Sequence, residues 1–291
     1  MKNTEKSFQE VIFTLQKYWS KIGCAIIQPT DLPVGAATFH PNSFFGTIDS
    51  KPISIAFLQA SRRPNDGRFG KSSNRLQHYY QFQVLIKPVP KNILDIYLNS
   101  LKKLNIDNSI HDIQFIEDDW KNPTLGAWGM GWEIWLNGLE ITQITYFQQM
   151  GSLDCYPITI EITYGLERIV AHIQNKKNVY ELIWSKNYLQ TITYGKLFLR
   201  NEVEHSKYNF EFATIEFLIE IFKKNLIEAE LMIEKKLLFP AYELILHANH
   251  IFNLLESRQA ISITERQNYI LKIKEITKKI AKSYLKNKQH Y

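Results

Sequence analysis

The chain has 291 residues, 45% of them hydrophobic, and a net charge of +6 with a pI of about 9.0. This length and apolar content suffice for one large domain or two smaller ones with a proper core. The two cysteines form no metal-binding pattern, and no apolar run approaches the roughly 20 residues that span a bilayer. Residues 1–6 lack the apolar core of a signal peptide. We therefore expect a cytoplasmic protein with reduced thiols and no membrane partner, whose positive charge permits an acidic partner such as RNA.

The N-terminal part of the chain predicts a helix followed by a long hairpin. Ser7 and Glu10 form a capping box at the start of a segment with helical apolar spacing. The apolar and aromatic runs on either side of a basic loop are typical of strands. The expected elements are a helix over residues 7–22, a short strand over 25–28, an irregular segment over 30–50 and a hairpin over about 53–88.

The middle of the chain predicts further strands, which form an antiparallel sheet with the hairpin. Asn137 and Gly138 separate two apolar runs and favour a two-residue hairpin turn. The expected elements are a helix over residues 92–104, strands over 113–117, 132–136, 140–149 and 159–163, and a loop over 118–128.

The C-terminal part changes to helical periodicity with few helix-breaking residues. Long helices are expected over 208–234, 241–256 and 264–286. The predicted fold class is therefore α+β, with an antiparallel-sheet domain over residues 1–175 and a mainly helical domain over residues 176–291.

The hairpin loop carries the strongest chemical signal in the chain. A planar guanidinium fork matches two phosphate oxygens at once. Four arginines crowd this glycine-containing loop: Arg62, Arg63, Arg68 and Arg75. On the returning strand Gln81 and Gln83 point to the face opposite Phe82, because side chains alternate along a strand. This pattern indicates a nucleotide site.

A second segment, residues 159–173, fits the first. Its residues predict a strand, a turn at Gly165 and the first turn of a helix from which Arg168 projects. The backbone amides at a helix start favour anions, so Arg168 adds a second group suited to phosphate. Together the two segments resemble motifs 2 and 3 of the class II aminoacyl-tRNA synthetases.

The resemblance is closer than the class, because nearly the whole chain resembles the alpha subunits of bacterial heterotetrameric glycyl-tRNA synthetases. The matching blocks include residues 15–19, 23–29, 122–129, 131–138, 208–210 and 260–269. The resemblance implies ATP-dependent activation of glycine and its transfer to tRNA-Gly, with Mg²⁺ beside the ATP. It also implies two kinds of protein partner, a larger beta subunit and a second alpha subunit.

The reaction requires positioning and charge stabilisation rather than a nucleophilic side chain. By resemblance, Arg62 or Arg63 clamps the α-phosphate and the substrate carboxylate, together with Arg168. Arg68 and Arg75 are then candidates for the outer phosphates. The alternative is that hairpin arginines are simply solvated.

Two further residues of the returning strand match the family's spacing. His78 is expected at the ATP site, and Phe82 is expected to stack on adenine with Arg168 over the other side of the base. The alternative for Phe82 is a place in the hydrophobic core.

Carboxylates flank the predicted site. By resemblance, Glu140 with a polar neighbour such as Gln143 holds the Mg²⁺ that bridges the ATP phosphates, since oxygen ligands suit this ion. The alternative for Glu140 is a solvent-facing position on its strand. Glu161 is expected to hold the substrate ammonium group, and Glu167 to brace an arginine.

Polar and bulky side chains complete the predicted amino-acid site. Gln81 and Gln83 are expected to bind the zwitterion, unless they only pair across the strands. A site for glycine must exclude any side chain, and a rigid wall does this better than attraction. We expect Trp120 or Trp132 to be that wall.

The sequence departs from the family at one position with consequences. The family usually has an arginine where this chain has Gly46, so contacts of that loop with phosphate or with a partner are in question. Lys51 is a candidate to replace it. The rival functions are a synthetase-like module that binds RNA or regulates another protein, and a relative that activates a different small substrate.

Overall fold

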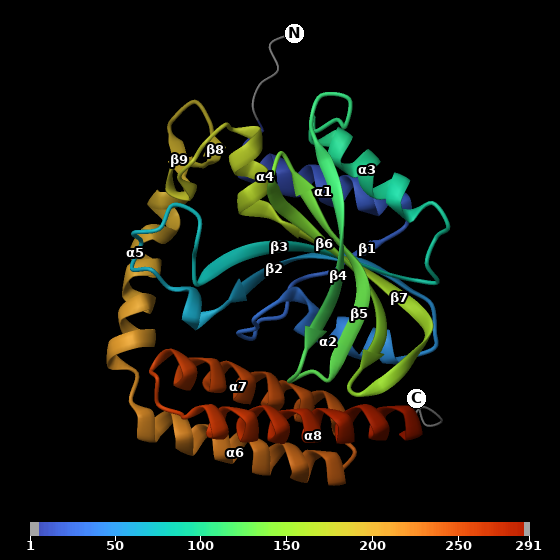
Figure 1. Cartoon of the computed structure of the whole chain (residues 1–291), viewed down its shortest axis with the longest axis vertical. Helices are drawn as coiled ribbons and strands as arrows, with labels where there is room; N and C mark the ends of the chain where they lie inside the picture. Colours follow the sequence, from blue (N-terminus) through green and yellow to red (C-terminus); the bar gives the residue numbers. More distant parts are fainter. Residues whose placement is uncertain (1–5, 288–291) are drawn as a thin grey trace.

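The computed structural model describes residues 6–287. Residues 1–5, on which the expectation of no signal peptide partly rests, lie outside the described residues. Seven strands form one sheet: β1 (Ala25–Ile26), β2 (Ile53–Arg62), β3 (His78–Lys87), β4 (Ile113–Asn122), β5 (Ala127–Leu136), β6 (Leu139–Met150) and β7 (Leu153–Gly165). Their order is β1-β2-β3-β7-β6-β5-β4, and every neighbouring pair except β1–β2 is antiparallel (Figure 1). The predicted antiparallel sheet is confirmed.

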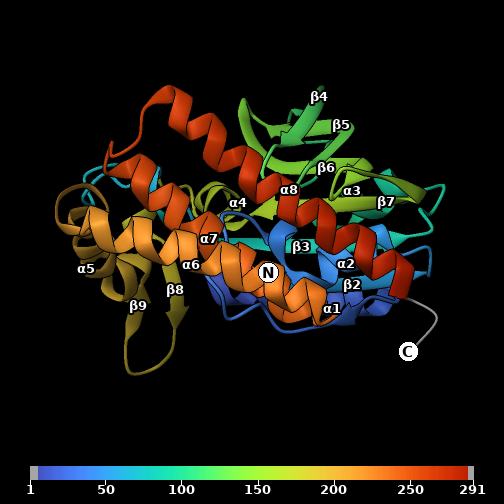
Figure 2. The same ribbon diagram turned by 90° about the horizontal axis from the view of Figure 1, so that it is seen from below.

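Helices cover both faces of the sheet. One face packs against α1 (Phe8–Ile22), α3 (Ile93–Lys103) and α4 (Leu166–Ile173), which lie together above the sheet in Figure 1. The other face packs against α2 (Pro41–Ile48) and, beyond it, α7 (Leu238–Ser257) and α8 (Ile263–Asn287), which lie below the sheet in Figure 1 and cross in front of it in Figure 2. The sheet is therefore the middle layer between two hydrophobic cores.

The first helix begins as its capping box predicts. The Glu10 carboxylate accepts hydrogen bonds from the Ser7 backbone N–H, at 2.7 Å, and from the Ser7 hydroxyl, at 2.6 Å. The helix ends at Gly23, whose φ of 110° is left-handed and suits a residue without a side chain. The α1 prediction is confirmed.

The predictions of irregular structure over residues 30–50 and 118–128 were wrong. Residues 30–50 contain a short 3₁₀ helix, η1 (Ala37–Phe39), and α2. Pro41 occupies the first turn of α2, where its missing N–H is harmless, and the His40 imidazole accepts from the Asn42 N–H at 3.1 Å. The expected loop over 118–128 is mostly strand, because β4 runs on to Asn122 and pairs with β5 along its length.

The C-terminal part is helical, as predicted, but its first helix begins at Tyr194 and not at residue 208. A small hairpin of β8 (Ile183–Lys186) and β9 (Thr191–Thr193) leads into α5 (Tyr194–Lys207), which the sequence argument missed. A five-residue π turn (Tyr208–Phe212) then precedes α6 (Ile215–Glu234), α7 and α8. Since α7 and α8 share a core with α2, the division after residue 175 stays a prediction. No helix within residues 6–287 is long and apolar enough to cross a membrane.

Candidate active site

The face of the sheet that lies under η1 is lined by polar side chains. We call it the polar face; its members are Ser61, Gln81, Gln83, Glu161 and Thr163. The Gln81 Oε1 accepts from the Ser61 hydroxyl at 2.8 Å and from the Ala37 N–H at 2.9 Å. Gln81 therefore holds η1 onto the sheet, in addition to any contact with substrate.

Glu161 is the most informative group on the polar face. It is 2% exposed, and its Oε1 accepts from the Thr38 hydroxyl at 2.6 Å. Within residues 6–287 neither its Oε2 nor the Gln83 Nε2 makes a hydrogen bond of ordinary geometry, although the Gln83 side chain is close enough to lower the pKa of Glu161. Burial raises the pKa of Glu161 to about 7, against the opposing effect of its hydrogen bonds. A buried carboxylate with a free oxygen suits a small cationic group, which would restore its ionised form.

Thr163 joins Glu161 to Gln83. Its hydroxyl lies 2.7 Å from the Gln83 Oε1 and 3.4 Å from the Glu161 Oε1. Gln83 thus has its oxygen engaged, while its Nε2 makes no hydrogen bond within residues 6–287. One acceptor and one donor group lie side by side, which is the arrangement that an ammonium and a carboxylate on one small molecule require.

The two consecutive arginines of the hairpin lie on opposite faces. Arg63 is on the polar face, where its Nε donates to the Gly35 carbonyl at 2.9 Å and its guanidinium lies 5.3 Å from the centre of the Tyr79 ring. Arg62 instead lines a separate pocket beside His205 and His250. Of the two candidates for the phosphate clamp, the structure therefore favours Arg63.

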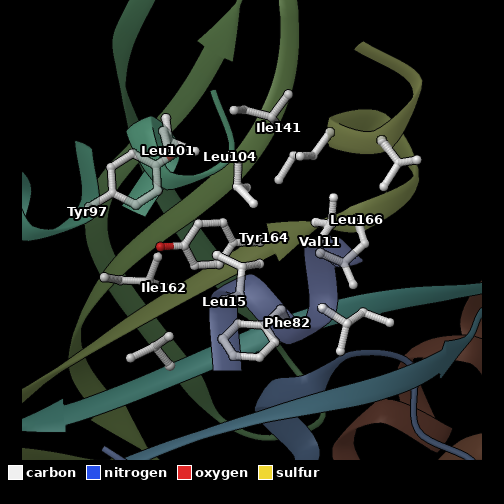
Figure 3. Packing of buried hydrophobic residues seen from close by; sticks show 14 of the residues in the cluster. Val11, Leu15, Phe82, Tyr97, Leu101, Leu104, Ile141, Ile162, Tyr164 and Leu166 are labelled. Carbon is white, nitrogen blue, oxygen red and sulfur yellow. The ribbon is translucent and has the colours of Figure 1, made fainter. Parts of the chain in front are cut away.

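The expected adenine-stacking role of Phe82 does not fit the structure. Its ring is fully buried among Leu15 and Tyr164 in the core beneath α1 (Figure 3). His78 lies on the same face as Phe82 and packs against Phe198 of α5, with its pKa lowered to about 4 by burial and by nearby Arg62 and His205. Both residues belong to the face opposite Gln81.

Tyr79 is the aromatic residue of this strand that lies on the polar face. It was missed, although the alternation that separates Gln81 from Phe82 places every second residue on this face. Tyr79 pairs with Ser61 across the hairpin, and its hydroxyl lies 3.5 Å from the Gly35 carbonyl. The alternation of side chains along β3 thus indicates Tyr79, whereas the family spacing indicated Phe82.

The remaining hairpin arginines are held within the loop. Arg68 donates to the Asn65 and Gly67 carbonyls, at 3.0 and 2.6 Å, and Arg75 forms an ion pair with Asp66 at 2.7 Å. Arg75 is largely exposed. Neither geometry assigns them to a phosphate, so their roles stay predictions.

Arg168 and Glu140 lie together. Their side chains form an ion pair at 2.8 Å, and the Arg168 guanidinium also donates to the Glu140 carbonyl at 2.9 Å. Gln143 donates to Asp118 at 3.2 Å, which places two more oxygen-bearing side chains on the sheet. No cluster of three metal-binding side chains is present within residues 6–287, so a Mg²⁺ there requires the phosphates of ATP as ligands.

The two candidate tryptophans are separated by the sheet. Trp120 on β4 pairs with Gly129 on β5, which in turn pairs with Phe147 on β6. The Trp120 ring therefore lies on the α2 side of the sheet and packs edge-on against the Phe147 ring, with 5.7 Å between the ring centres. Trp132 lies on the other face, against Tyr146 at 5.7 Å. Trp132 therefore lies on the face opposite the polar face, and of the two predicted wall residues Trp120 is the one on the same side as Glu161.

Glu167 braces the sheet instead of an arginine. Its carboxylate accepts from the Tyr80 N–H at 2.8 Å and from the Tyr194 hydroxyl at 2.9 Å. Burial raises its pKa to about 7, while these hydrogen bonds and nearby Arg168 oppose the shift. The start of α4 is thereby tied to β3 and to α5.

Gly46 and Lys51 line the same shallow pocket, together with Phe239 and Tyr284. A Cβ at Gly46 would lie 2.5 Å from the Ile53 Cδ1, so a larger residue there requires that side chain to move. None of the residues that line this pocket belongs to the polar face. Gly46 therefore lies beside side chains of the C-terminal helices and away from the polar face.

Comparison with known proteins finds relatives of almost the entire chain. The family described as "Glycyl-tRNA synthetase alpha subunit" matches residues 8–289. A relative, the "Glycine--tRNA ligase alpha subunit" of Buchnera aphidicola subsp. Baizongia pistaciae (strain Bp), is 57% identical over 290 residues, or 99% of this chain and 97% of the relative. Two structures of pyrrolysyl-tRNA synthetase from Desulfitobacterium hafniense align at a TM-score of 0.47, with 10% and 12% identity, covering 66% and 67% of this chain and 74% and 79% of theirs.

The antiparallel sheet with helices following it is the fold of an aminoacyl-tRNA synthetase subunit. The family match and the close relative together extend over almost the entire chain. The chain belongs to the family of glycyl-tRNA synthetase alpha subunits.

Proposed function

We propose that this chain is the catalytic subunit of a glycine–tRNA ligase, which activates glycine with ATP and transfers it to tRNA-Gly. The observation that carries the proposal is the pair of unpartnered groups on the polar face, the Glu161 Oε2 and the Gln83 Nε2. They lie on the face of the sheet that also presents Arg63. A cradle for a small zwitterion and a cation for phosphate meet on one surface.

The chemistry follows from these groups. The glycine ammonium binds Glu161, and an oxygen of the glycine carboxylate attacks the α-phosphorus of ATP as pyrophosphate leaves. The O–P bond that forms gives glycyl-adenylate. Arg63 neutralises the negative charge that builds up on the α-phosphate. Such electrostatic stabilisation of the transition state is usually the largest single contribution to catalysis of this kind of step. The 3′ end of the tRNA then takes the glycyl group and AMP leaves.

ATP enters this scheme as its Mg²⁺ complex. Glu140 is the carboxylate proposed to reach the ion, and Arg168, its ion-pair partner, is proposed to lie against the nucleotide. Tyr79 replaces Phe82 as the aromatic proposed to pack on adenine, because it is on the polar face. The ring of Trp120 is the proposed wall against side chains larger than hydrogen.

The proposed partners are the beta subunit and a second copy of this chain, in the cytoplasm. The outer surface of α6 and the start of α7 expose large apolar side chains, at 43–63% of their area: Phe217, Ile227, Leu231, Leu237 and Phe239. Such a surface is typical of protein interfaces. Light scattering should show a dimer of the isolated chain that becomes a heterotetramer with beta. A monomer that ignores beta would contradict this part of the proposal.

The proposed activity is tested by ATP–pyrophosphate exchange with each amino acid, with and without the beta subunit. Exchange that requires glycine supports the proposal. Exchange with a different small amino acid would assign another substrate. An absence of exchange with every amino acid, in a folded complex with beta, would favour the RNA-binding or regulatory module.

A further inference from the structure

A second pocket lies at the far end of the hairpin, where β2 meets α5, the π turn and α7. Its volume is about 230 Å³. Two aliphatic side chains of α7 line one wall, and the rest of the lining is polar: Arg62, Gln77, His205, Tyr208, Asn209 and His250. We call this the hairpin-end pocket. No carboxylate lines it, in contrast to the polar face.

The decisive group in the hairpin-end pocket is Asn209. It is 2% exposed, and its Nδ2 has no hydrogen-bond partner within residues 6–287. A buried amide N–H₂ without an acceptor costs roughly 1–3 kcal/mol, so such groups are rare in folded proteins. An acceptor in the pocket would satisfy it.

Gln77 presents a second amide to this pocket. It is also 2% exposed, and its Nε2 is likewise without a partner in the described part of the chain. Glu202 accepts from the Gln77 backbone N–H at 2.8 Å. Burial raises the pKa of Glu202, and its hydrogen bonds with Gln77, side chain included, oppose the shift. Because Gln77 has this neighbour, Asn209 is the stronger of the two indications.

The pocket has one fixed cation, Arg62. Within residues 6–287 the Arg62 guanidinium makes no hydrogen bond or ion pair, although it is only partly exposed. Burial and the charge of Arg62 lower the pKa values of His205 and His250, the latter to about 4. Each imidazole therefore offers one N–H donor without adding a full positive charge. The pocket combines one fixed cation with several neutral donors.

The walls are fixed by hydrogen bonds between distant segments. The Phe69 N–H of the hairpin loop donates to the Ser206 hydroxyl of α5 at 3.0 Å, and the Ser257 hydroxyl of α7 donates to the Asn65 Oδ1 at 2.8 Å. Asn209 itself sits in the π turn, whose Phe210 carbonyl accepts from Arg258. Single π turns inside helices are frequent at functional sites. The donors are thus held in place before any ligand binds.

We propose that the hairpin-end pocket binds a phosphate-class oxyanion, held by the Arg62 guanidinium fork and the Asn209 amide. A tetrahedral oxyanion has enough acceptor oxygens to satisfy several donors at once, and the absence of a lining carboxylate removes the main repulsion. The anion is either free phosphate or a backbone phosphate of RNA. This site is separate from the polar face and does not depend on the proposed reaction.

The position of Arg62 gives the pocket a consequence for the polar face. Arg62 is the last residue of β2, and Arg63 follows it on the opposite face. An anion bound by Arg62 would link this end of the hairpin to α5 and α7. It would thereby fix the backbone that presents Arg63, so occupancy of the pocket should change the rate of adenylate formation without entering the active site.

The test is titration of the full-length chain with inorganic phosphate, followed by calorimetry or ³¹P NMR in a low-salt chloride buffer. Replacing Arg62→Gln should weaken phosphate binding by about tenfold or more, the effect of losing one charge-assisted contact. Asn209→Asp keeps the shape and turns a donor into a charged acceptor, so binding should be abolished. The matched control is His247→Gln on the exposed side of α7, which should leave the affinity within about twofold.

Two further measurements separate this site from the active site. Arg63→Gln should retain phosphate binding in the pocket while it loses glycine-dependent exchange. If Arg63→Gln abolishes phosphate binding and Arg62→Gln does not, or if Arg62→Gln and folded Asn209→Asp both bind phosphate like the wild type, the proposal is overturned. No binding at tens of millimolar phosphate, about the weakest range that calorimetry detects, would overturn it as well.

A competition arm identifies the source of the phosphate. A short single-stranded RNA that displaces inorganic phosphate from the wild type, and loses affinity in Asn209→Asp, assigns the pocket to an RNA backbone. An RNA that leaves phosphate bound assigns it to the free anion. Circular dichroism of each variant controls for folding, since Asn209 is buried.

Discussion

The polar face and the hairpin-end pocket lie on opposite sides of one hairpin, and the difference that matters for their ligands is a buried carboxylate. The polar face contains a buried carboxylate, Glu161, beside the amide of Gln83. The lining of the hairpin-end pocket, as far as the structure describes it, has no carboxylate and includes the donors Asn209 and Arg62. A zwitterion fits the first surface and an anion fits the second. Arg62, the last residue of β2, and Arg63, which follows it, lie on opposite faces, and this is why we propose different ligands for them.

The largest expected effect is a loss of stability, and it tests which face of β3 packs in the hydrophobic core. Phe82→Ala should destabilise the fold by roughly 3–5 kcal/mol, because the ring is fully buried. Tyr79→Leu, the matched change on the polar face, should cost less stability and should raise the KM for ATP. Urea unfolding and exchange kinetics of both variants measure the two effects. If Tyr79→Leu leaves ATP binding unchanged while a folded Phe82→Ala weakens it, the faces have been assigned the wrong way round.

The next effect concerns the cations proposed to act on the α-phosphate and the nucleotide. Arg63→Ala and Arg168→Ala should each lower glycine-dependent exchange by about a hundredfold or more, the equivalent of ~2–4 kcal/mol of transition-state stabilisation. Arg200→Ala is the control, since Arg200 is 91% exposed on α5. Near wild-type exchange in a folded Arg63→Ala, Arg168→Ala double variant would show that the clamp lies elsewhere.

Glu161→Gln should separate substrate binding from stability. Burial raises the pKa of Glu161 from 4.5 to about 7, so the folded state holds its proton more tightly than the unfolded chain. The wild type therefore loses stability as pH rises from 4.5 to 7, and no further above that. Replacement by Gln should remove this loss and stabilise the protein at pH 8, relative to pH 5, by about 1–3 kcal/mol.

The same variant should raise the KM for glycine, because the ammonium group loses its counterion. Unfolding at both pH values and exchange kinetics at pH 8 measure the two consequences, with exposed Glu275→Gln as the control. An unchanged KM for glycine would remove Glu161 from the substrate site, whatever the stability shows.

Much of the fold could be predicted from local signals in the sequence. The Ser7–Glu10 capping box, the Asn137–Gly138 turn and the apolar spacing of the last helix all proved correct. The segment over residues 30–50 was misjudged because η1 and α2 are short and are stabilised by contacts with the sheet and α7. Tertiary packing of this kind leaves little trace in local periodicity.

The site was predicted less completely than the fold. Alternation along the strand correctly placed Gln81 and Phe82 on opposite faces. The family spacing nevertheless predicted that Phe82 contacts the adenine, on the same side as Gln81. The side of the sheet on which Trp120 and Trp132 lie depends on the register of β4 and β5, which local sequence does not reveal. The hairpin-end pocket could not be foreseen, because its donors come from segments separated by more than a hundred residues.

The smallest expected effect is on specificity, and the two tryptophans form the comparison. A site for glycine excludes larger amino acids by contact with a wall, and a pocket discriminates one methyl group by only about 1–3 kcal/mol. Trp120→Ala should therefore reduce the preference for glycine over alanine by roughly ten- to a hundredfold, since the ring lies on the side of the sheet that faces α2. Trp132→Ala removes a ring of the same size from the opposite core and should leave that preference unchanged. The ratio of exchange rates with glycine and alanine, in variants shown to be folded, measures both. Equal ratios in Trp120→Ala and the wild type would mean that another group closes the site.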